Sequence, residues 1–92
     1  SYRCRKCSLQ LAKSDDFLSG NFRGQHGKAK LFGGASNLDL DKPVERTMTT
    51  GLHVIQDVHC QQCKEYVGWK YKEAPESQKY KEGKYLLEME LL

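Results

Sequence analysis

The second half of the chain is dominated by stretches in which apolar and polar residues follow the period of an extended strand. LHVIQDVHC at 52–60 alternates along its length, so that every second side chain falls on the same face. RTMTT at 46–50 is rich in β-branched residues, and YVGWKYK at 66–72 is rich in aromatic ones. Both residue classes suit the half-buried surface of a pleated sheet. The pattern predicts successive β-strands across these three stretches.

The remaining elements predicted by the pattern are short. KAKLF at 28–32 is typical of a strand, and KYLLEMEL at 84–91 alternates more loosely. Helical signals are confined to SDDFL at 14–18 and PESQKYKE at 75–82. The second opens on a proline, which the first turn of a helix tolerates.

Turn signals divide the first half of the chain. Glycines at 20, 24 and 27 predict turns within residues 13–27, and GGASNLDLDKPVE at 33–45 predicts a loop of about a dozen residues. A loop of this length in a compact domain is more often functional or mobile than incidental. Strands so short, with turns so frequent, do not fit βαβ units. We therefore predict a mainly β fold in a single domain that spans residues 1–92.

Composition narrows the class of protein. Hydrophobic residues make up 38% and charged residues 29%, which is typical of a folded globular domain and not of a disordered chain. No apolar run approaches the roughly 18 residues of a membrane helix, so no membrane partner is expected. Lysines alternate with acids, as in KYKEAPESQKYKEGKY at 70–85, which indicates a mixed-charge surface and makes nucleic acid an improbable partner.

The four cysteines form two C-x-x-C pairs, Cys4 with Cys7 and Cys60 with Cys63. Two disulfides would require an oxidising compartment, and no signal peptide is visible in the sequence to indicate one. Each disulfide would also close a loop too small to constrain the chain. A redox C-x-x-C belongs to a βαβ context that the pattern does not predict. Zinc prefers four tetrahedral ligands, and Cys₄ is a common closed set. We interpret the cysteines as one structural zinc site that joins distant segments.

The zinc interpretation changes how nearby residues are understood. The formal charge of +3 counts four neutral thiols; as thiolates they subtract four charges and Zn²⁺ adds two, which leaves +1. The neighbouring Arg5, Lys6 and Lys64 are expected to offset part of the thiolate charge. Because four cysteines complete the ligand set, His53 and His59 are predicted to be strand-face side chains and not ligands.

Catalytic signals are weak. The chain has no GxSxG or HExxH motif. A closed Cys₄ zinc site keeps no open position for a reacting water. We therefore predict that the protein is not an enzyme.

A spaced signature extends over nearly the whole chain. Its residues are Cys4, Cys7, Gly27, Leu31, Asn37, Gly51, Cys60, Cys63 and Gly68-Trp69-Lys70-Tyr71, and the stretches TGLH at 50–53 and ESQKYKEGKY at 76–85 accompany it. This combination resembles the signature of the Yippee-like zinc-binding proteins.

The resemblance implies a β-tent, in which two antiparallel sheets meet at a steep angle and a Cys₄ zinc site pins them at one end. This outline is shared with the thalidomide-binding domain of cereblon and with methionine sulfoxide reductase B. The reductase adds a nucleophilic cysteine to its four zinc ligands. Here no thiol is left once zinc is bound, so a reductase reaction, which needs an attacking thiolate, is not expected.

Cereblon also directs attention to Trp69. In cereblon a tryptophan after the second C-x-x-C forms one wall of an aromatic cage, and Trp69 occupies the matching place. The other two cage tryptophans have no counterpart, because this chain has a single Trp. One alternative is a reduced ligand pocket lined by Trp69, His53, Tyr71 and Asn37. The other is that Trp69 packs in the core, as a lone tryptophan in a small domain often does.

Three hypotheses for function follow. The preferred one is a zinc-stabilised, non-catalytic module that binds other proteins. The resemblance implies a setting in nucleus and cytoplasm, in a complex such as a ubiquitin ligase, whose subunits are then the expected partners. The second hypothesis is a reader of a small ligand or modified side chain at Trp69. The third is a nucleic-acid-binding zinc module, in which bases would stack on exposed aromatic residues. Its candidate aromatic residues are Phe17, Phe22, Phe32, Tyr66 and Tyr71.

Overall fold

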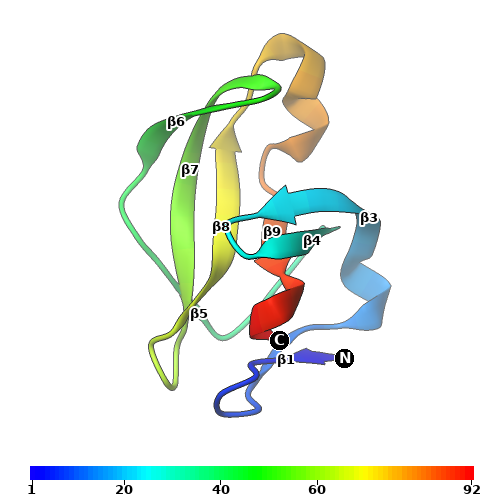
Figure 1. Ribbon diagram of the computed structural model, residues 1–92, viewed down its shortest axis with the longest axis vertical. Helices are drawn as coiled ribbons and strands as arrows, with labels where there is room; N and C mark the ends of the chain where they lie inside the picture. The colour runs from blue at the N-terminus through cyan, green and yellow to red at the C-terminus, as the bar shows by residue number, and fades with distance from the viewer.

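The computed structural model describes residues 1–92 as antiparallel strands joined by short turns (Figure 1). The strands are β1 (Tyr2–Arg3), β2 (Gln10–Ala12), β3 (Phe17–Gly24), β4 (Gly27–Phe32), β5 (Leu38–Leu40), β6 (Val44–Met48), β7 (Gly51–Cys60), β8 (Tyr66–Glu73) and β9 (Tyr85–Glu88). The 3₁₀ helices are η1 (Ser14–Asp16), η2 (Glu76–Lys81) and η3 (Met89–Leu91). None of these helices has the length and apolar character needed to cross a membrane.

The strands form two antiparallel sheets. β1 and β2 make a small sheet, and the larger sheet has the order β3-β4-β9-β8-β7-β5, with β6 also paired to β7. In Figure 1, β3 and β4 run steeply across the direction of β6, β7 and β8, and β9 lies where the two groups meet. The predicted mainly β fold with two antiparallel sheets is confirmed. The steep crossing lies within the larger sheet, on either side of β9.

The buried side chains form two separate clusters. The cysteine core consists of Cys4, Leu11, Ala12, Phe32, Val58, Cys60, Val67 and Leu87. The tryptophan core consists of Ala29, Leu31, Ile55, Trp69, Tyr71 and Leu86. Leu86 and Leu87 are adjacent in β9, and adjacent strand residues point to opposite faces. The two cores therefore lie on opposite sides of this strand.

Strand β7 follows the predicted alternation, but each of its faces is buried over only part of its length. His53 and Ile55 are fully buried on one face, towards the tryptophan core. Val58 and Cys60 are fully buried on the other face, in the cysteine core. The buried side chains thus lie on one face in the first half of β7 and on the other face in the second half, so the strand contributes to both cores.

The backbones of β8 and β9 approach closely at Gly68. A Cβ atom at this position would lie 1.9 Å from the carbonyl oxygen of Leu86 and 3.0 Å from the Cα of Leu87. Only glycine fits, because the atoms that a side chain would meet belong to the backbone and cannot rotate away. Gly68 therefore sets the distance between the two central strands.

A β-bulge lies beside this close approach. Val58 pairs with Gly68 and His59 pairs with Tyr66, which leaves Val67 without a partner across the ladder. An extra residue of this kind changes the alternation of the strand that carries it. Val67 consequently belongs to the cysteine core, whereas Tyr66 packs against the tryptophan core, of which Trp69 is a member.

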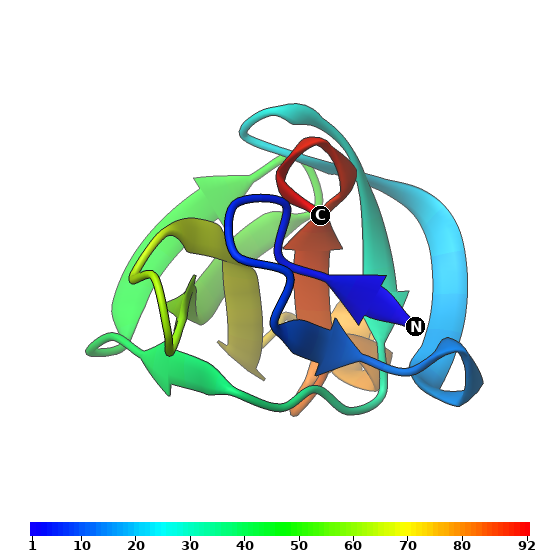
Figure 2. The ribbon, with the colours of Figure 1, turned by 90° about the horizontal axis from the view of Figure 1, so that it is seen from below.

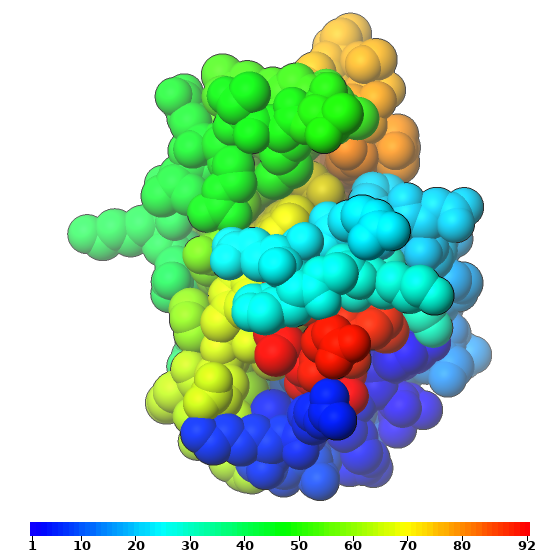
Figure 3. Space-filling view, in the orientation of Figure 1, coloured from blue at the N-terminus to red at the C-terminus, as the bar shows by residue number.

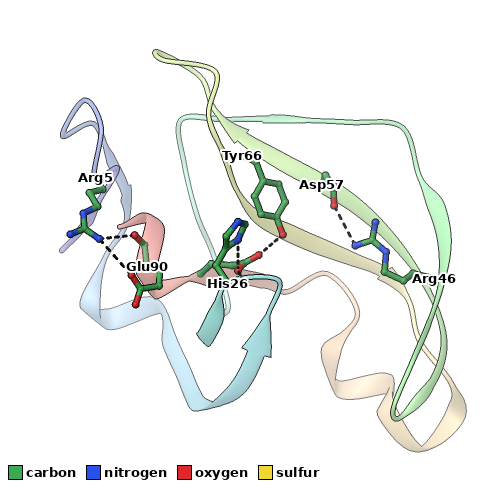
Figure 4. Close-up of polar contacts among 7 residues, drawn as sticks. Arg5, His26, Arg46, Asp57, Tyr66 and Glu90 are labelled. Atoms are coloured by element: carbon green, nitrogen blue, oxygen red, sulfur yellow. Dashed lines mark hydrogen bonds and ion pairs between the residues drawn. The ribbon is translucent and has the colours of Figure 1, made fainter.

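A fully buried carboxylate ties the β3–β4 turn to the centre of the sheet. The hydroxyl of Tyr66 donates to Oε2 of Glu88, and the backbone N–H of His26 donates to Oε1 at 2.6 Å. Nδ1 of the His26 ring lies 3.0 Å from the same Oε1 (Figure 4). Burial alone would raise the pKa of Glu88, but these hydrogen bonds hold its pKa below the ordinary value.

Two details of the sequence prediction are wrong. The stretch 33–45 is not one loop, because Leu38–Leu40 pairs with Val58–Cys60 and forms β5. Gly20 does not make a turn, since it lies inside β3, where a shift in register between Ser19 and Phe22 absorbs it. In both cases strand pairing outweighs local propensity. The two short helical signals correspond to the 3₁₀ helices η1 and η2.

We predict that Glu88→Gln destabilises the fold at neutral pH by about 1–3 kcal/mol, because it disrupts hydrogen bonds to a buried carboxylate. The folded-state pKa of Glu88 is lowered, so its ionisation stabilises the fold above the ordinary pKa of 4.5 and this contribution is lost as pH falls further. The difference in free energy of unfolding between wild type and variant should therefore shrink in acid. Urea titrations at pH 7 and below pH 4 measure it. Glu90→Gln, at an exposed position of η3, is the control, and an equal effect there would contradict the prediction.

We predict that Gly68→Ala costs about 3 kcal/mol of folding free energy, since the new methyl group overlaps backbone atoms of β9. Trp69 follows directly, so its fluorescence should shift to the red as the packing loosens. Gly20→Ala is the matched control, because its Cβ would meet only the Phe17 ring, at an ordinary 3.6 Å. Equal melting temperatures for the two variants would show that the close approach at Gly68 is not required.

Candidate metal centre and ligand cleft

The four cysteine sulfurs converge at one end of the molecule. All four lie within 4.8 Å of one another. Sγ of Cys4 is 3.5 Å from Sγ of Cys63, and Sγ of Cys7 is 3.4 Å from Sγ of Cys60. Tetrahedral zinc with Zn–S bonds of about 2.3 Å separates its sulfurs by about 3.8 Å. The number, type and spacing of the donors therefore fit a zinc ion.

The first cysteine pair lies on a tight turn closed by backbone hydrogen bonds. The N–H of Ser8 donates to the carbonyl of Cys4 at 2.8 Å, and the N–H of Cys4 donates to the carbonyl of Leu9 at 2.9 Å. Ser8 has a φ of 66°, a left-handed conformation that is uncommon for a residue with a side chain. This turn aims the thiols of Cys4 and Cys7 in the same direction.

The second pair repeats the first residue for residue. The N–H of Lys64 donates to the carbonyl of Cys60 at 2.8 Å, and the N–H of Cys60 donates to the carbonyl of Glu65 at 2.8 Å. Lys64 takes the left-handed conformation with a φ of 68°. Figure 2 shows the N-terminal turn and the β7–β8 turn at the same end of the molecule. The site is thus built from two copies of one local structure that lie far apart in the chain.

The thiols influence one another's ionisation. The backbone N–H of Leu9 hydrogen-bonds to Cys7 and lowers the pKa of its thiol to about 7. The N–H of Glu65 favours the thiolate of Cys63 in the same way, but burial and the neighbouring sulfurs raise its pKa to about 12. Four thiolates in so small a volume need a cation to balance them. A divalent metal supplies this charge and displaces the protons.

The basic residues beside the cysteines are engaged with carboxylates. Lys6 also interacts with the thiols as expected, because its pKa is raised mainly by Glu65 and further by Cys63 and Cys4. Lys6 lies 2.7 Å from Glu65, and Lys64 lies 2.9 Å from Asp39. Arg5 donates to the carbonyl of Glu90 at 3.0 Å and lies 3.7 Å from its carboxylate (Figure 4). The pair between Lys6 and Glu65 connects the two cysteine turns. All three pairs are exposed, so they contribute little to stability compared with the metal.

A cleft of about 700 Å³ lies away from the cysteines, beside the tryptophan core. Strand β8 contributes Trp69 and Tyr71, β3 contributes Phe22, and η2 contributes Tyr80 and Lys81. In the space-filling view of Figure 3, β8 is visible at the bottom of a hollow between β3, the β6–β7 hairpin and η2. The side chain of Trp69 is 5% exposed. It therefore belongs both to the core and to the wall of the cleft.

The structure brings together only part of the predicted pocket. Trp69 and Tyr71 line the cleft. His53 is fully buried behind it, where Nδ1 lies 2.8 Å from the carbonyl of Gly51. Asn37 does not take part: it lies in the turn before β5, and its side-chain amide donates to the carbonyl of Gln10 at 2.8 Å. Its left-handed conformation, with a φ of 61°, explains an asparagine at this position without a ligand.

Sequence reasoning missed Lys81, which is 4% exposed and lies inside the cleft. The surrounding run of lysines and glutamates indicates a solvated surface, and Lys72, Glu76 and Lys79 in that run are indeed exposed. The only signal in the sequence is the helical stretch at 75–82. The 3₁₀ helix η2, which is kinked at Gln78 and too short to show periodicity, carries Lys81 inward.

We predict that a chelator strong enough to remove zinc unfolds the protein cooperatively, because the metal holds together segments that half of the chain separates. Cys63→Ser should bind less than one zinc per chain and melt at a lower temperature. Gln62→Ala, an exposed change in the same turn, should keep one zinc per chain. Native mass spectrometry counts the metal, and circular dichroism follows the melting. A chain that keeps its melting temperature after complete loss of zinc would contradict a structural role for the metal.

Comparisons with known proteins agree with this geometry. A family model described as "Yippee zinc-binding/DNA-binding /Mis18, centromere assembly" matches residues 1–92. The chain is 47% identical over 89 residues to human protein yippee-like 3, covering 96% of this chain and 75% of that protein. It is also 47% identical over 90 residues to rat protein yippee-like 4, covering 97% of this chain and 71% of that protein.

A solved structure has the same fold. The crystal structure of the Mis18 "Yippee-like" domain superposes with a TM-score of 0.77 at 19% identity, covering 97% of this chain and 87% of that one. The chain belongs to the Yippee family and carries that family's zinc-binding cysteine cluster.

Proposed function

We propose that the protein is a zinc-stabilised, non-catalytic module that works by binding other proteins. The observation that carries the proposal is the convergence of all four cysteines of the chain on one closed site. Each thiol is used as a ligand, so none is left to act as a nucleophile. A four-coordinate site also leaves no position for a reacting water. The metal then serves to hold a surface in shape.

The edges of the larger sheet offer such a surface. β3 pairs only with β4, so its outer edge carries unpaired backbone groups. Leu18 on β3 is 52% exposed, and Leu52 at the start of β7 is 54% exposed. An exposed strand edge can accept a strand from a partner, and exposed leucines add apolar contact.

The family suggests where to look for a partner. Its description includes centromere assembly, which is a process of multiprotein complexes. The resemblance noted from the sequence makes a multisubunit ubiquitin ligase the first complex to test, with the protein acting as a subunit or regulator in nucleus and cytoplasm. The four cysteines are free thiols placed to bind a metal and are not paired as disulfides, which supports a reducing compartment.

A second candidate function is the recognition of a small ligand or a modified side chain. The cleft beside Trp69 favours it, because this volume lies within the range of small-molecule sites. Nucleic-acid binding has less support. Phe32 and Tyr71 are buried, so two of the five aromatic residues proposed for base stacking are not available on the surface.

Affinity purification of the zinc-loaded chain from native cells tests the main proposal. We expect at least one stoichiometric protein partner that survives 0.3 M salt. Leu18→Glu and Leu52→Glu each place a charge at an exposed leucine, on different parts of the sheet. The variant whose leucine lies in the interface should lose the partner, and the other variant should keep it. Lys72→Glu, also exposed, controls for added negative charge. Recovery of no stoichiometric partner by the wild-type chain would contradict the proposal.

A further inference from the structure

The cleft beside Trp69 has an unusual combination of charge and apolar surface. Three basic residues line it, Arg23, Arg46 and Lys81, and no aspartate or glutamate is among its 16 lining residues. The rest of the wall includes the aromatic rings of Phe22 and Tyr71. A site for a cation would need acidic residues or an uncharged aromatic cage. These walls would repel a methylated lysine.

Lys81 is a buried cation without a counter-ion. It takes part in none of the ion pairs of the structure. Its Nζ lies 3.2 Å from the hydroxyl of Thr50 and 3.5 Å from Nε2 of His53. The rings of Tyr71 and Phe22 lie beside it, with centroids 5.3 and 5.7 Å from Nζ. Buried charges in proteins are normally paired, so this arrangement leaves an anion site unfilled.

His53 explains how the ammonium is held. Nδ1 of His53 lies 2.8 Å from the carbonyl of Gly51, which can only accept, so the ring proton sits on Nδ1. Nε2 then presents a lone pair to Lys81. An ammonium group has three N–H donors, and the two neutral acceptors described above engage only two of them. Burial lowers the pKa of Lys81, and an anion in the cleft would counteract that effect.

The indole of Trp69 supplies a second donor. Its Nε1 is buried with no partner at full hydrogen-bond distance. Burial raises the pKa of the Tyr71 hydroxyl, and a weak interaction with this indole lowers that pKa by a smaller amount. Both Trp69 and Lys81 flank Tyr71: the Trp69 ring centroid lies 6.1 Å from that of Tyr71, and the Lys81 ammonium lies 5.3 Å from it. A buried N–H left unpaired costs about 1–3 kcal/mol, which a ligand acceptor would recover.

The charge balance selects among anions. Lys81 is the buried cation, whereas Arg46 is partly exposed and has a carboxylate, Asp57, 3.9 Å away (Figure 4). A carboxylate brings one negative charge, which matches one buried ammonium, while a phosphate monoester brings nearly two. The adjoining aromatic rings suit a flat apolar body next to the charged group.

We propose that this cleft binds a carboxylate carried on a flat apolar group. Lys81 and the indole N–H of Trp69 hold the carboxylate, and Phe22 and Tyr71 contact the apolar group. The proposal rests on the second candidate function, recognition of a small ligand, and specifies its chemistry. The carboxylate can come from a free acid or from the C-terminus of a polypeptide, since both present the same group.

Nuclear magnetic resonance on the zinc-loaded chain tests the proposal directly. The chain has one tryptophan, so its indole N–H gives a single resonance. The probes are N-acetylphenylalanine, its neutral amide, and phenethyltrimethylammonium. We expect a saturable downfield shift of the indole proton with the acid, and affinities weaker by about tenfold or more for the other two. Equal binding of acid and amide, or preference for the ammonium compound, would overturn the proposal.

Two lysine variants test whether the acid binds in the cleft or at exposed lysines. Lys81→Met keeps the length of the side chain and should weaken the acid by about 10- to 100-fold, the loss of one charge-assisted hydrogen bond. Lys72→Met removes an exposed lysine of β8 outside the cleft and should leave the affinity unchanged. Zinc content and near-ultraviolet circular dichroism establish that each variant is folded. If Lys81→Met does not fold, the comparison of acid with amide on the wild type decides the question.

Two further arms identify the source of the carboxylate and keep the two proposals apart. A peptide that ends in a free phenylalanine is compared with its amidated form, to test binding of a polypeptide C-terminus. If the peptide binds more tightly than N-acetylphenylalanine, the site is assigned to a C-terminus; if it binds more weakly, the site is assigned to a small acid. Partner recovery is measured with Lys81→Met as well. Stoichiometric partners recovered while the acid fails to bind would overturn the cleft proposal and leave the interaction module intact.

Discussion

The cross-link between two distant cysteine turns is the interaction on which the rest of the structure depends. Most of the buried apolar residues are divided between a cysteine core of eight and a tryptophan core of six, on opposite sides of β9. Neither cluster is large, and small domains often need a staple to be stable. Cys4 and Cys60 belong to the cysteine core themselves, so a metal bound by them is continuous with the hydrophobic packing. The N-terminal segment makes only a two-stranded sheet of its own, and it is held to the rest of the molecule by the cysteine turn together with the buried side chains of Leu11 and Ala12.

The centre of the sheet explains why a cleft exists at the opposite side. Gly68 lets β8 and β9 approach closely, and the bulge at Val67 directs Tyr66 and Trp69 to the same face. Glu88 then fixes the β3–β4 turn over that face through Tyr66 and His26. These contacts hold the β3–β4 hairpin across the face on which the cleft beside Trp69 opens. Trp69 is both a core residue and part of the cleft wall.

The sequence predicts the metal ligands better than it predicts the cleft, and the reason is physical. Two C-x-x-C turns are local structures, so Cys4, Cys7, Cys60 and Cys63 can be recognised from spacing alone. The alternation of β7 is equally local. Asn37 and Lys81 are different, because what decides their surroundings is which strands pair and how η2 folds against the sheet. A left-handed turn explains the first, and inward packing of a short 3₁₀ helix explains the second. Neither effect has a periodic signature.

The position of β9 has a consequence for how the chain is made. It is the last strand in sequence, yet it lies in the middle of the larger sheet between β4 and β8. During synthesis β3–β4 and β7–β8 can form as hairpins, but they cannot be joined until residues 85–88 have left the ribosome. The metal site likewise waits for Cys63. The two hairpins therefore become one sheet only when residues 85–88 are available, and the two cores, which lie on either side of β9, are completed at the same step.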